Sequence, residues 1–174
     1  MWQLDWTKLA DILTYDPRQP MIFSSGLFLF LFLGFSLIYV LLQKQTTARL
    51  LFVSAFSYYF YYKSSGIYFF LLGIVTVSDF LLAARMDRTE TLWKRKLLVV
   101  ISLCINLGLL CYFKYTNFFY EMLCPLWNGH YEAFDIFLPV GISFFTFQSL
   151  SYTLDVYRRD LKPLDNLLDY VFYV

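Results

Sequence analysis

The chain has 174 residues, 59% of them apolar and only 16% charged, against about 25% charged in ordinary soluble domains. The net charge of +1 leaves no basic field that would favour nucleic acid as a partner. Residues 21–42 hold no charged side chain, and about 20 apolar residues suffice to cross a bilayer. Composition therefore excludes a soluble globular protein and predicts an integral protein of the lipid bilayer.

The first 20 residues are a polar extension with Trp2 and Trp6, and their apolar residues favour a short interfacial helix that ends before Pro17. They lack a basic n-region, and no small-residue cleavage site follows the apolar run at 22–42. That run is therefore expected to stay as an anchor helix. Residues 1–20 are treated as an interfacial extension and residues 21–174 as a transmembrane domain.

The next apolar stretch, 50–84, is too long for one span and short for two. Lys63 and the following Ser-Ser-Gly interrupt it, which predicts spans over about 50–62 and 66–84. Two further spans are predicted over about 97–113 and 136–155. Another apolar helix starts at 164 and reaches Val174 without a breaker, so we expect a truncated chain. The predicted fold class is an all-α, polytopic transmembrane helical bundle of about five spans plus the start of another.

The placement of basic residues favours this count. With the N-terminus outside, the predicted inner loops carry ten Lys and Arg residues and the outer segments four. If 50–84 were a single span, the five basic residues of 85–96 would lie outside, against the positive-inside rule. The segment 114–135 is then extracytoplasmic. We expect it to hold an amphipathic surface helix that Pro125 kinks or ends.

The segment 138–158 is mostly apolar but carries polar side chains on two sides of a helical wheel. One side holds Ser143, Thr146, Ser149 and Thr153, and the nearly opposite side holds Gln148, Ser151 and Asp155. Unpaired polar groups are costly in hydrocarbon, so this helix should have protein or a water-filled cavity on both flanks. Pro139 suits a first helical turn, and Gly141 would allow a close neighbour.

Residues 139–158 read Pro-Val-Gly-Ile-Ser-Phe-Phe-Thr-Phe-Gln-Ser-Leu-Ser-Tyr-Thr-Leu-Asp-Val-Tyr-Arg. This segment resembles the signature of the membrane-bound O-acyltransferases (MBOAT), in particular the bacterial branch that acetylates alginate and other exported polysaccharides. The segments 22–33, 57–62 and 112–119 agree with the same family, in its order and at similar spacing. The resemblance covers about 22–174, and members of the family are more than twice as long.

The resemblance implies transfer of an acyl group, with acetyl as the expected one, from a cytoplasmic-side donor such as acetyl-CoA or an acyl carrier. The acceptor would be a hydroxyl of an exported polysaccharide such as alginate, and periplasmic partner proteins would complete the modification. The implied location is the bacterial inner membrane, with several passes and an extracytoplasmic N-terminus. No cofactor or metal site is expected, because the sequence holds no Cys/His ligand set, phosphate loop or serine-triad motif.

The family uses an intramembrane histidine as general base. The one histidine here, His130, lies in a polar loop beside Asn128-Gly129, so the catalytic histidine is expected beyond Val174 and this chain should be inactive alone. Asp79 is an ionisable residue in a predicted span; the favoured interpretation is pairing with Arg85 or reaching the headgroups, and the alternative is a functional site. Asn106 is expected to form a helix–helix hydrogen bond.

Six residues of the signature segment are candidates for lining a tunnel or forming the motif: Pro139, Gly141, Gln148, Tyr152, Asp155 and Arg158. Asp155 and Arg158 would either form an i,i+3 ion pair or shape the cytoplasmic mouth through which the donor approaches. Gln148 and Tyr152 would either line the tunnel or act in packing.

Two other hypotheses remain open from the residues alone. The polar helix 138–158 could line a permeation path or bind a partner in a non-enzymatic transport or scaffold subunit. The chain could also be an inactive truncated homologue. A histidine in an apolar helix beyond Val174 would favour the enzyme.

Overall fold

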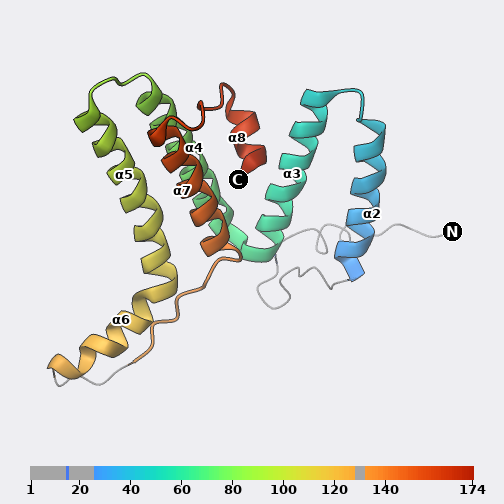
Figure 1. Ribbon diagram of the computed structural model, residues 1–174. Helices are drawn as coiled ribbons and strands as arrows, with labels where there is room; N and C mark the ends of the chain where they lie inside the picture. Colours follow the sequence, from blue (N-terminus) through green and yellow to red (C-terminus); the bar gives the residue numbers. More distant parts are fainter. Residues whose placement is uncertain (1–14, 16–25, 128–131) are drawn as a thin grey trace. The chain divides into compact units, whose positions relative to one another are not determined.

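The computed structural model describes residue 15 and residues 26–127 and 132–174, apart from the side chains of three of them (Figure 1). Every regular element in these ranges is helical, which confirms the all-α prediction. The chain divides into two compact units, Met1–Leu71 and Leu72–Val174. The predicted interfacial helix within 1–20 and the turn that carries His130 lie outside the described residues.

In the first unit, α2 (Gly26–Leu41) and α3 (Thr46–Ser65) are joined by a short turn. The ring of Phe35 on α2 stacks on Phe52 and Phe56 of α3, with centroid distances of 5.1 and 4.4 Å. Away from this contact, α2 exposes apolar side chains, and Phe30 and Leu41 are each 81% exposed. Such exposure suits a lipid environment.

The break predicted inside the stretch 50–84 is confirmed. The helix α3 ends at Ser65, and Gly66 has a φ of +58°. Glycine adopts this left-handed value without steric strain because it has no Cβ. A short 3₁₀ turn, η1 (Gly66–Tyr68), leads into α4 (Phe69–Asp87). The apolar stretch 50–84, which is too long for a single span, therefore forms two helices.

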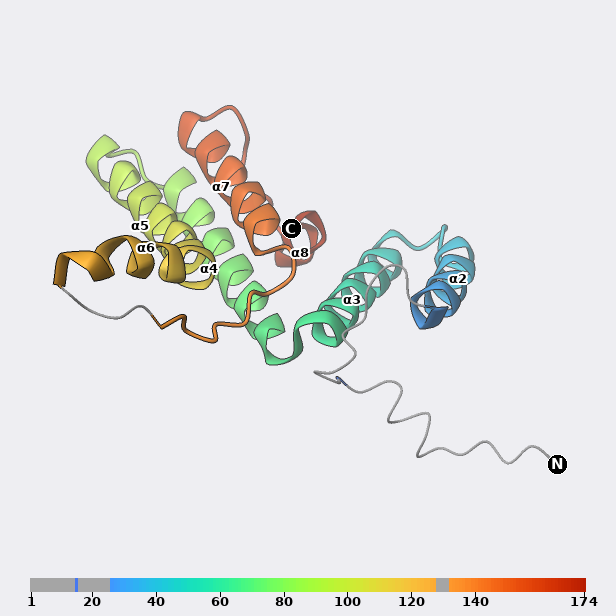
Figure 2. The same ribbon diagram turned by 90° about the horizontal axis from the view of Figure 1, so that it is seen from below.

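The second unit brings together α4, α5 (Leu92–Leu110), α7 (Ile142–Arg158) and α8 (Leu167–Tyr173), as Figures 1 and 2 show. The helices α5 and α7 are antiparallel: Arg95 near the start of α5 bonds Tyr157 near the end of α7. At the other end, the Lys114 Nζ donates to the Ser143 Oγ at 3.2 Å. The apolar core draws on all four helices, through Ala83, Met86, Val99, Tyr152, Val156 and Tyr170.

The helix that begins at Leu92 runs further than predicted. Instead of ending near 113, it continues through a π-helical turn, η2 (Cys111–Tyr115), into α6 (Thr116–Leu123). Figure 1 shows α6 leaving the direction of α5 at this turn, as expected where the hydrogen-bond ladder slips by one residue. The predicted surface helix is thus an extension of α5. It ends at Leu123, and Pro125 lies in the following 3₁₀ turn, η3 (Cys124–Trp127).

The helix α7 starts later than predicted, at Ile142 rather than 136, so two expectations about its N-terminus are wrong. Pro139 precedes the helix in a turn that the Ile142 N–H closes by donating to the Pro139 carbonyl at 3.3 Å. Gly141 has a φ of +73° at the third position of this turn, the position that favours glycine in a type II turn. No atom lies within 4 Å of the place its Cβ would take, so backbone conformation, not close packing, requires this glycine.

Two helical runs within the described residues are long and apolar enough to cross a membrane, Thr46–Asp87 and Leu92–Leu123. A shorter apolar helix covers Phe28–Leu41. This is consistent with the predicted membrane bundle, and the number of five spans stays a prediction.

Candidate functional site

The most unusual polar group of the second unit is the carboxylate of Asp79 on α4, which is completely buried. Its Oδ1 accepts a hydrogen bond from the Ser102 Oγ at 2.6 Å, and its Oδ2 accepts one from the Asn106 Nδ2 at 2.8 Å. Ser102 and Asn106 are four residues apart and therefore on one face of α5. The favoured interpretation of Asp79 is wrong: it neither pairs with Arg85 nor reaches the surface. The predicted helix–helix hydrogen bond of Asn106 is confirmed.

Two more helices reach the same carboxylate. The Ser149 side chain on α7 lies beside the Asp79 carboxylate. The Tyr170 hydroxyl on α8 donates to the Ser149 Oγ at 3.4 Å. Asp79, Ser102, Asn106, Ser149 and Tyr170, here called the Asp79 cluster, are each 0% exposed. One buried carboxylate thus links four helices.

Ser102 and Asn106 both donate to the Asp79 carboxylate, and the Asn106 Nδ2 also donates to the Ser102 carbonyl at 3.1 Å. An ionised carboxylate only accepts, and hydroxyl and amide donors supply what it needs. Among the described residues, no Lys or Arg joins the cluster, so only hydroxyl and amide dipoles bond to the carboxyl group. The Asn106 Oδ1 is the one buried side-chain atom of the cluster without a hydrogen-bond partner. Because the cluster is enclosed, it can fix helices but cannot act on a substrate in this arrangement.

The two polar sides of α7 have different surroundings. Thr146, Ser149 and Thr153 are 0–1% exposed, which confirms that this side faces protein. On the other side, the Gln148 Nε2 donates to the Tyr173 carbonyl of α8, while its Oε1 is buried without a partner. Ser151 is exposed and bonds back to the Gln148 carbonyl of its own helix at 2.9 Å. On the second flank, Gln148 and Asp155 are therefore half-buried and Ser151 is exposed.

Tyr152 acts in packing. Its side chain is 2% exposed, and its hydroxyl accepts a hydrogen bond from the Leu164 N–H at 2.9 Å. The ring lies 4.7 Å from that of Tyr170 and 5.8 Å from that of Tyr173. These contacts hold α8 and the segment before it against α7. A role of Tyr152 or Gln148 in lining a tunnel stays a prediction.

At the C-terminus of α7 the structure shows no ion pair between Asp155 and Arg158, both of which it describes. The backbone carbonyl of Asp155 accepts hydrogen bonds from the N–H groups of Asp160 and Leu161, at 3.0 and 3.3 Å. Arg159 adopts a φ of +67°, so the helix ends in a left-handed residue that is not glycine. Arg158 is exposed and Asp155 half-buried, and their proposed role at a cytoplasmic mouth stays a prediction.

Arg95 supports this end of α7 and was not among the candidates from sequence. It is 4% exposed and donates to the carbonyls of Val156 and Tyr157 at 3.3 and 2.6 Å. Its guanidinium also lies 5.6 Å from the centre of the Tyr157 ring. In the sequence Arg95 stands between Lys94 and Lys96, and nothing distinguishes it from solvated loop charges. In the structure Arg95 lies four residues before Val99 and seven before Ser102, on the buried face of α5.

Comparison with known proteins gives several relatives. The chain is 35% identical over 164 residues to the probable alginate O-acetylase AlgI of Pseudomonas aeruginosa, covering 88% of this chain and 30% of the relative. It is 36% identical over 163 residues to the protein of the same name from Azotobacter vinelandii, covering 88% and 32%. It is 31% identical over 156 residues to the peptidoglycan O-acetyltransferase of Helicobacter pylori, covering 87% and 30%.

No family model and no solved structure matches the chain. The chain spans about a third of the length of the curated relatives it matches. The match extends over nearly all of the chain, and the relatives are O-acetyltransferases, as the resemblance from sequence implied. The chain belongs to the membrane-bound O-acyltransferase family, with alginate and peptidoglycan O-acetyltransferases as its relatives.

Proposed function

We propose that the protein to which this chain belongs is an O-acetyltransferase of a bacterial cytoplasmic membrane, and that this chain is its N-terminal portion. Its reaction transfers an acetyl group from a cytoplasmic-side donor to hydroxyls of an exported polysaccharide, with alginate as the first candidate acceptor. The observation that carries the proposal is identity of 31–36% to O-acetyltransferases over about 88% of the chain.

The structure supports a framework role for this portion. The signature segment forms α7, which the Asp79 cluster and Tyr152 fix against α4, α5 and α8. A transferase that brings two substrates together inside a bilayer needs rigid walls, because misplacement of reacting groups is costly. The helix α7, held on one side and partly open at Ser151 on the other, suits one wall of such a cavity.

The orientation follows from the basic residues. The contact from Arg95 to Tyr157 brings the α4–α5 turn and the C-terminus of α7 to the same end of the second unit. Five basic residues of 85–96 and three of 158–162 therefore gather there. By the positive-inside rule this end is cytoplasmic, and a donor such as acetyl-CoA or an acyl carrier would approach it. Acceptor and periplasmic partner proteins would meet the opposite end.

The test begins with the gene beyond codon 174. The full protein is expressed, and the first histidine found in an apolar helix is replaced by alanine, with an exposed loop histidine as control. We expect acetyl groups on the polymer to disappear at unchanged protein level, because general-base catalysis contributes about 10²–10⁴-fold.

Acetylation that persists in the alanine variant, or a complete gene without such a histidine, would move the assignment to a transport or scaffold subunit. His130 provides a second comparison. His130→Ala is expected to leave acetylation unchanged, since its polar loop setting does not resemble the family's catalytic position.

A further inference from the structure

One side chain joins α6 to the segment that leads into α7. The Asn117 Nδ2 donates to the Phe134 carbonyl, and the Phe134 N–H donates to the Asn117 Oδ1, both at 2.9 Å. The side-chain amide thus pairs with both backbone groups of one residue, as a neighbouring strand would. The centres of the Tyr120 and Phe134 rings lie 5.0 Å apart beside these bonds. We call the pairing of Asn117 with Phe134 the Asn117 clamp.

The segment 132–138 gains little stability from burial. It forms no helix or strand, and every residue in it is exposed except Ile136, which is half-buried. Phe134 and Leu138 are 51% and 48% exposed. A segment with few buried apolar contacts opens at a low cost in free energy, so its hydrogen bonds weigh heavily in fixing its position. Removal of the Asn117 clamp should therefore free this segment.

A residue one turn earlier holds the far end of the same connection. Lys114 precedes Asn117 by three residues, and its Nζ donates to the Ser143 Oγ in the first turn of α7 at 3.2 Å. Between the two bonded positions lie Pro139, which is buried, and Gly141 with its left-handed φ. The π-helical turn η2, which redirects α6 away from α5, lies at Lys114. The entry to the signature helix is thus held at both of its ends.

This entry lies at the end of the second unit opposite the basic segments 85–96 and 158–162, which the positive-inside rule predicts to be cytoplasmic. Under the proposed function, on which this inference rests, the donor reaches the cytoplasmic end and the exported acceptor reaches the other. We propose that Asn117 is a positioning residue for the acceptor, because it fixes the segment 132–138 as the rim past which the acceptor hydroxyl approaches α7. A rim that is already ordered lowers the entropy cost of binding a substrate there.

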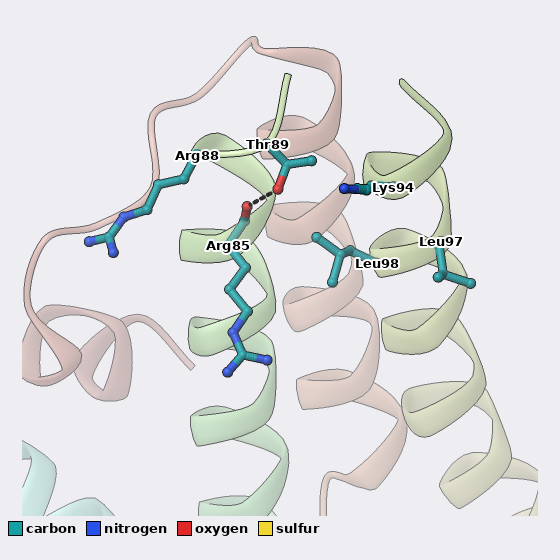
Figure 3. Close-up of a pocket in the computed structure, with 6 residues that line it drawn as sticks. All are labelled: Arg85, Arg88, Thr89, Lys94, Leu97 and Leu98. Atoms are coloured by element: carbon teal, nitrogen blue, oxygen red, sulfur yellow. Dashed lines mark hydrogen bonds between the residues drawn. The ribbon is translucent and has the colours of Figure 1, made fainter. Parts of the chain in front are cut away.

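The opposite end of α5 provides a matched control. Figure 3 shows the turn between α4 and α5, where the Thr89 hydroxyl donates to the Arg85 carbonyl at 2.7 Å. Thr116, next to Asn117, provides a second control, since its hydroxyl donates to the Tyr112 carbonyl of its own helical run at 2.6 Å. Thr89→Val and Thr116→Val each remove one such hydrogen bond and leave the Asn117 clamp intact.

The first arm of the test measures amide hydrogen exchange of the full protein in micelles. Asn117→Leu keeps the side-chain volume and removes both hydrogen bonds of the clamp. Exchange in 132–138 should become about tenfold faster, at about threefold for each bond lost. Thr89→Val and Thr116→Val should change it less than about twofold. Unchanged exchange in Asn117→Leu, or an equal increase in Thr116→Val, would overturn the clamp.

The second arm measures transfer from labelled acetyl-CoA to deacetylated alginate oligomers, in permeabilised spheroplasts that hold the full protein and its periplasmic partners. Asn117→Leu should raise the KM for the oligomer about tenfold, and the KM for acetyl-CoA should stay within about twofold of the unsubstituted protein. An unchanged KM for the oligomer, or an equal rise in both KM values, would contradict acceptor positioning. Absence of transfer by the unsubstituted protein would overturn the proposed function and the acceptor role with it, while hydrogen exchange would still report on the clamp.

Discussion

Asp79 is an ionisable residue that the second unit buries without a Lys or Arg partner among the described residues. Burial of an uncompensated carboxylate would cost about several kcal/mol. Ser102 and Asn106 reduce this cost by donating hydrogen bonds to it. The donors come from another helix, so the same bonds that stabilise the carboxyl group also fix the helix packing.

The first prediction concerns this carboxylate. Asp79→Ala should lower the free energy of unfolding of the full protein by about 2–4 kcal/mol, because it leaves buried donors unpaired. Asp79→Asn should cost less, since the amide keeps the volume and one acceptor. Ser102→Ala, which removes a single donor, should cost about 1 kcal/mol. Denaturant titration in micelles measures all three.

The matched control for Asp79 is Asp87→Ala on the same helix, where the side chain is exposed. Its effect should stay within about 0.5 kcal/mol. An equal loss for both aspartates would mean that the Asp79 cluster does not stabilise the fold.

Sequence reasoning found these polar residues but assigned only one of their partners correctly. Asn106 was expected to bond across helices, and it does. The position of Asp79 near the predicted cytoplasmic boundary favours pairing with Arg85 or contact with headgroups, whereas its donors lie 23 and 27 positions away on α5. Spacing along one helix indicates which residues share a face, but it does not say which face of another helix meets it.

At the scale of elements, glycines of the second unit have opposite roles. Gly141 has a φ of +73°, whereas Gly108 lies inside α5, and neither has an atom within 4 Å of a Cβ. Space is therefore available at both positions, and only backbone conformation differs. A Cβ costs about 1–2 kcal/mol in the left-handed region, while alanine is about 1 kcal/mol better than glycine inside a helix.

The second prediction follows from that contrast. Gly141→Ala should lower the midpoint of thermal unfolding, and Gly108→Ala should leave it unchanged or raise it. Each variant is the control for the other, because both add one methyl group in open space. A loss of stability in Gly108→Ala alone would indicate that the glycine in α5 is required for a contact outside this chain.

The third prediction concerns the end of α7. Arg95→Met keeps much of the volume but removes the bonds to the Val156 and Tyr157 carbonyls. We expect faster amide hydrogen exchange in the segment 155–161, because C-terminal carbonyls lose their donor and the last turn opens more often. Lys96→Met, exposed on the same helix, should leave exchange in this segment unchanged. Equal exchange in both variants would contradict a capping role for Arg95.

The elements themselves were easier to predict from sequence than their ends. The break at Gly66 followed from a lysine and small residues inside an apolar run, and it is confirmed. The start of α7 was placed six residues too early, because Ile136, Phe137 and Leu138 are apolar and read as helix. The continuation of α5 into α6 was missed, since a π-helical turn leaves no clear mark in hydrophobic periodicity.

At the scale of the whole molecule, charge predicts the orientation. Apolar runs identify the helices and the family relationship indicates the chemistry, but neither says which end of the bundle meets the cytoplasm. The distribution of Lys and Arg predicts it, because positively charged loops are preferentially retained inside. The contact of Arg95 with α7 adds that two of these basic segments lie at one end of the second unit.

The fourth prediction tests this orientation and the number of spans together. Single cysteines replace Lys44, Asp87, Glu132 or Lys162 in a full protein from which all native cysteines, including the three of this chain, have been removed, and a membrane-impermeant maleimide is added to spheroplasts. Glu132→Cys should react at once, and the other three only after permeabilisation. If the run Thr46–Asp87 crossed the membrane once, Lys44→Cys and Asp87→Cys would label from opposite sides. Labelling of both from the cytoplasmic side requires that the chain turn back near Gly66, where the sequence places a lysine, two serines and a glycine between apolar helices.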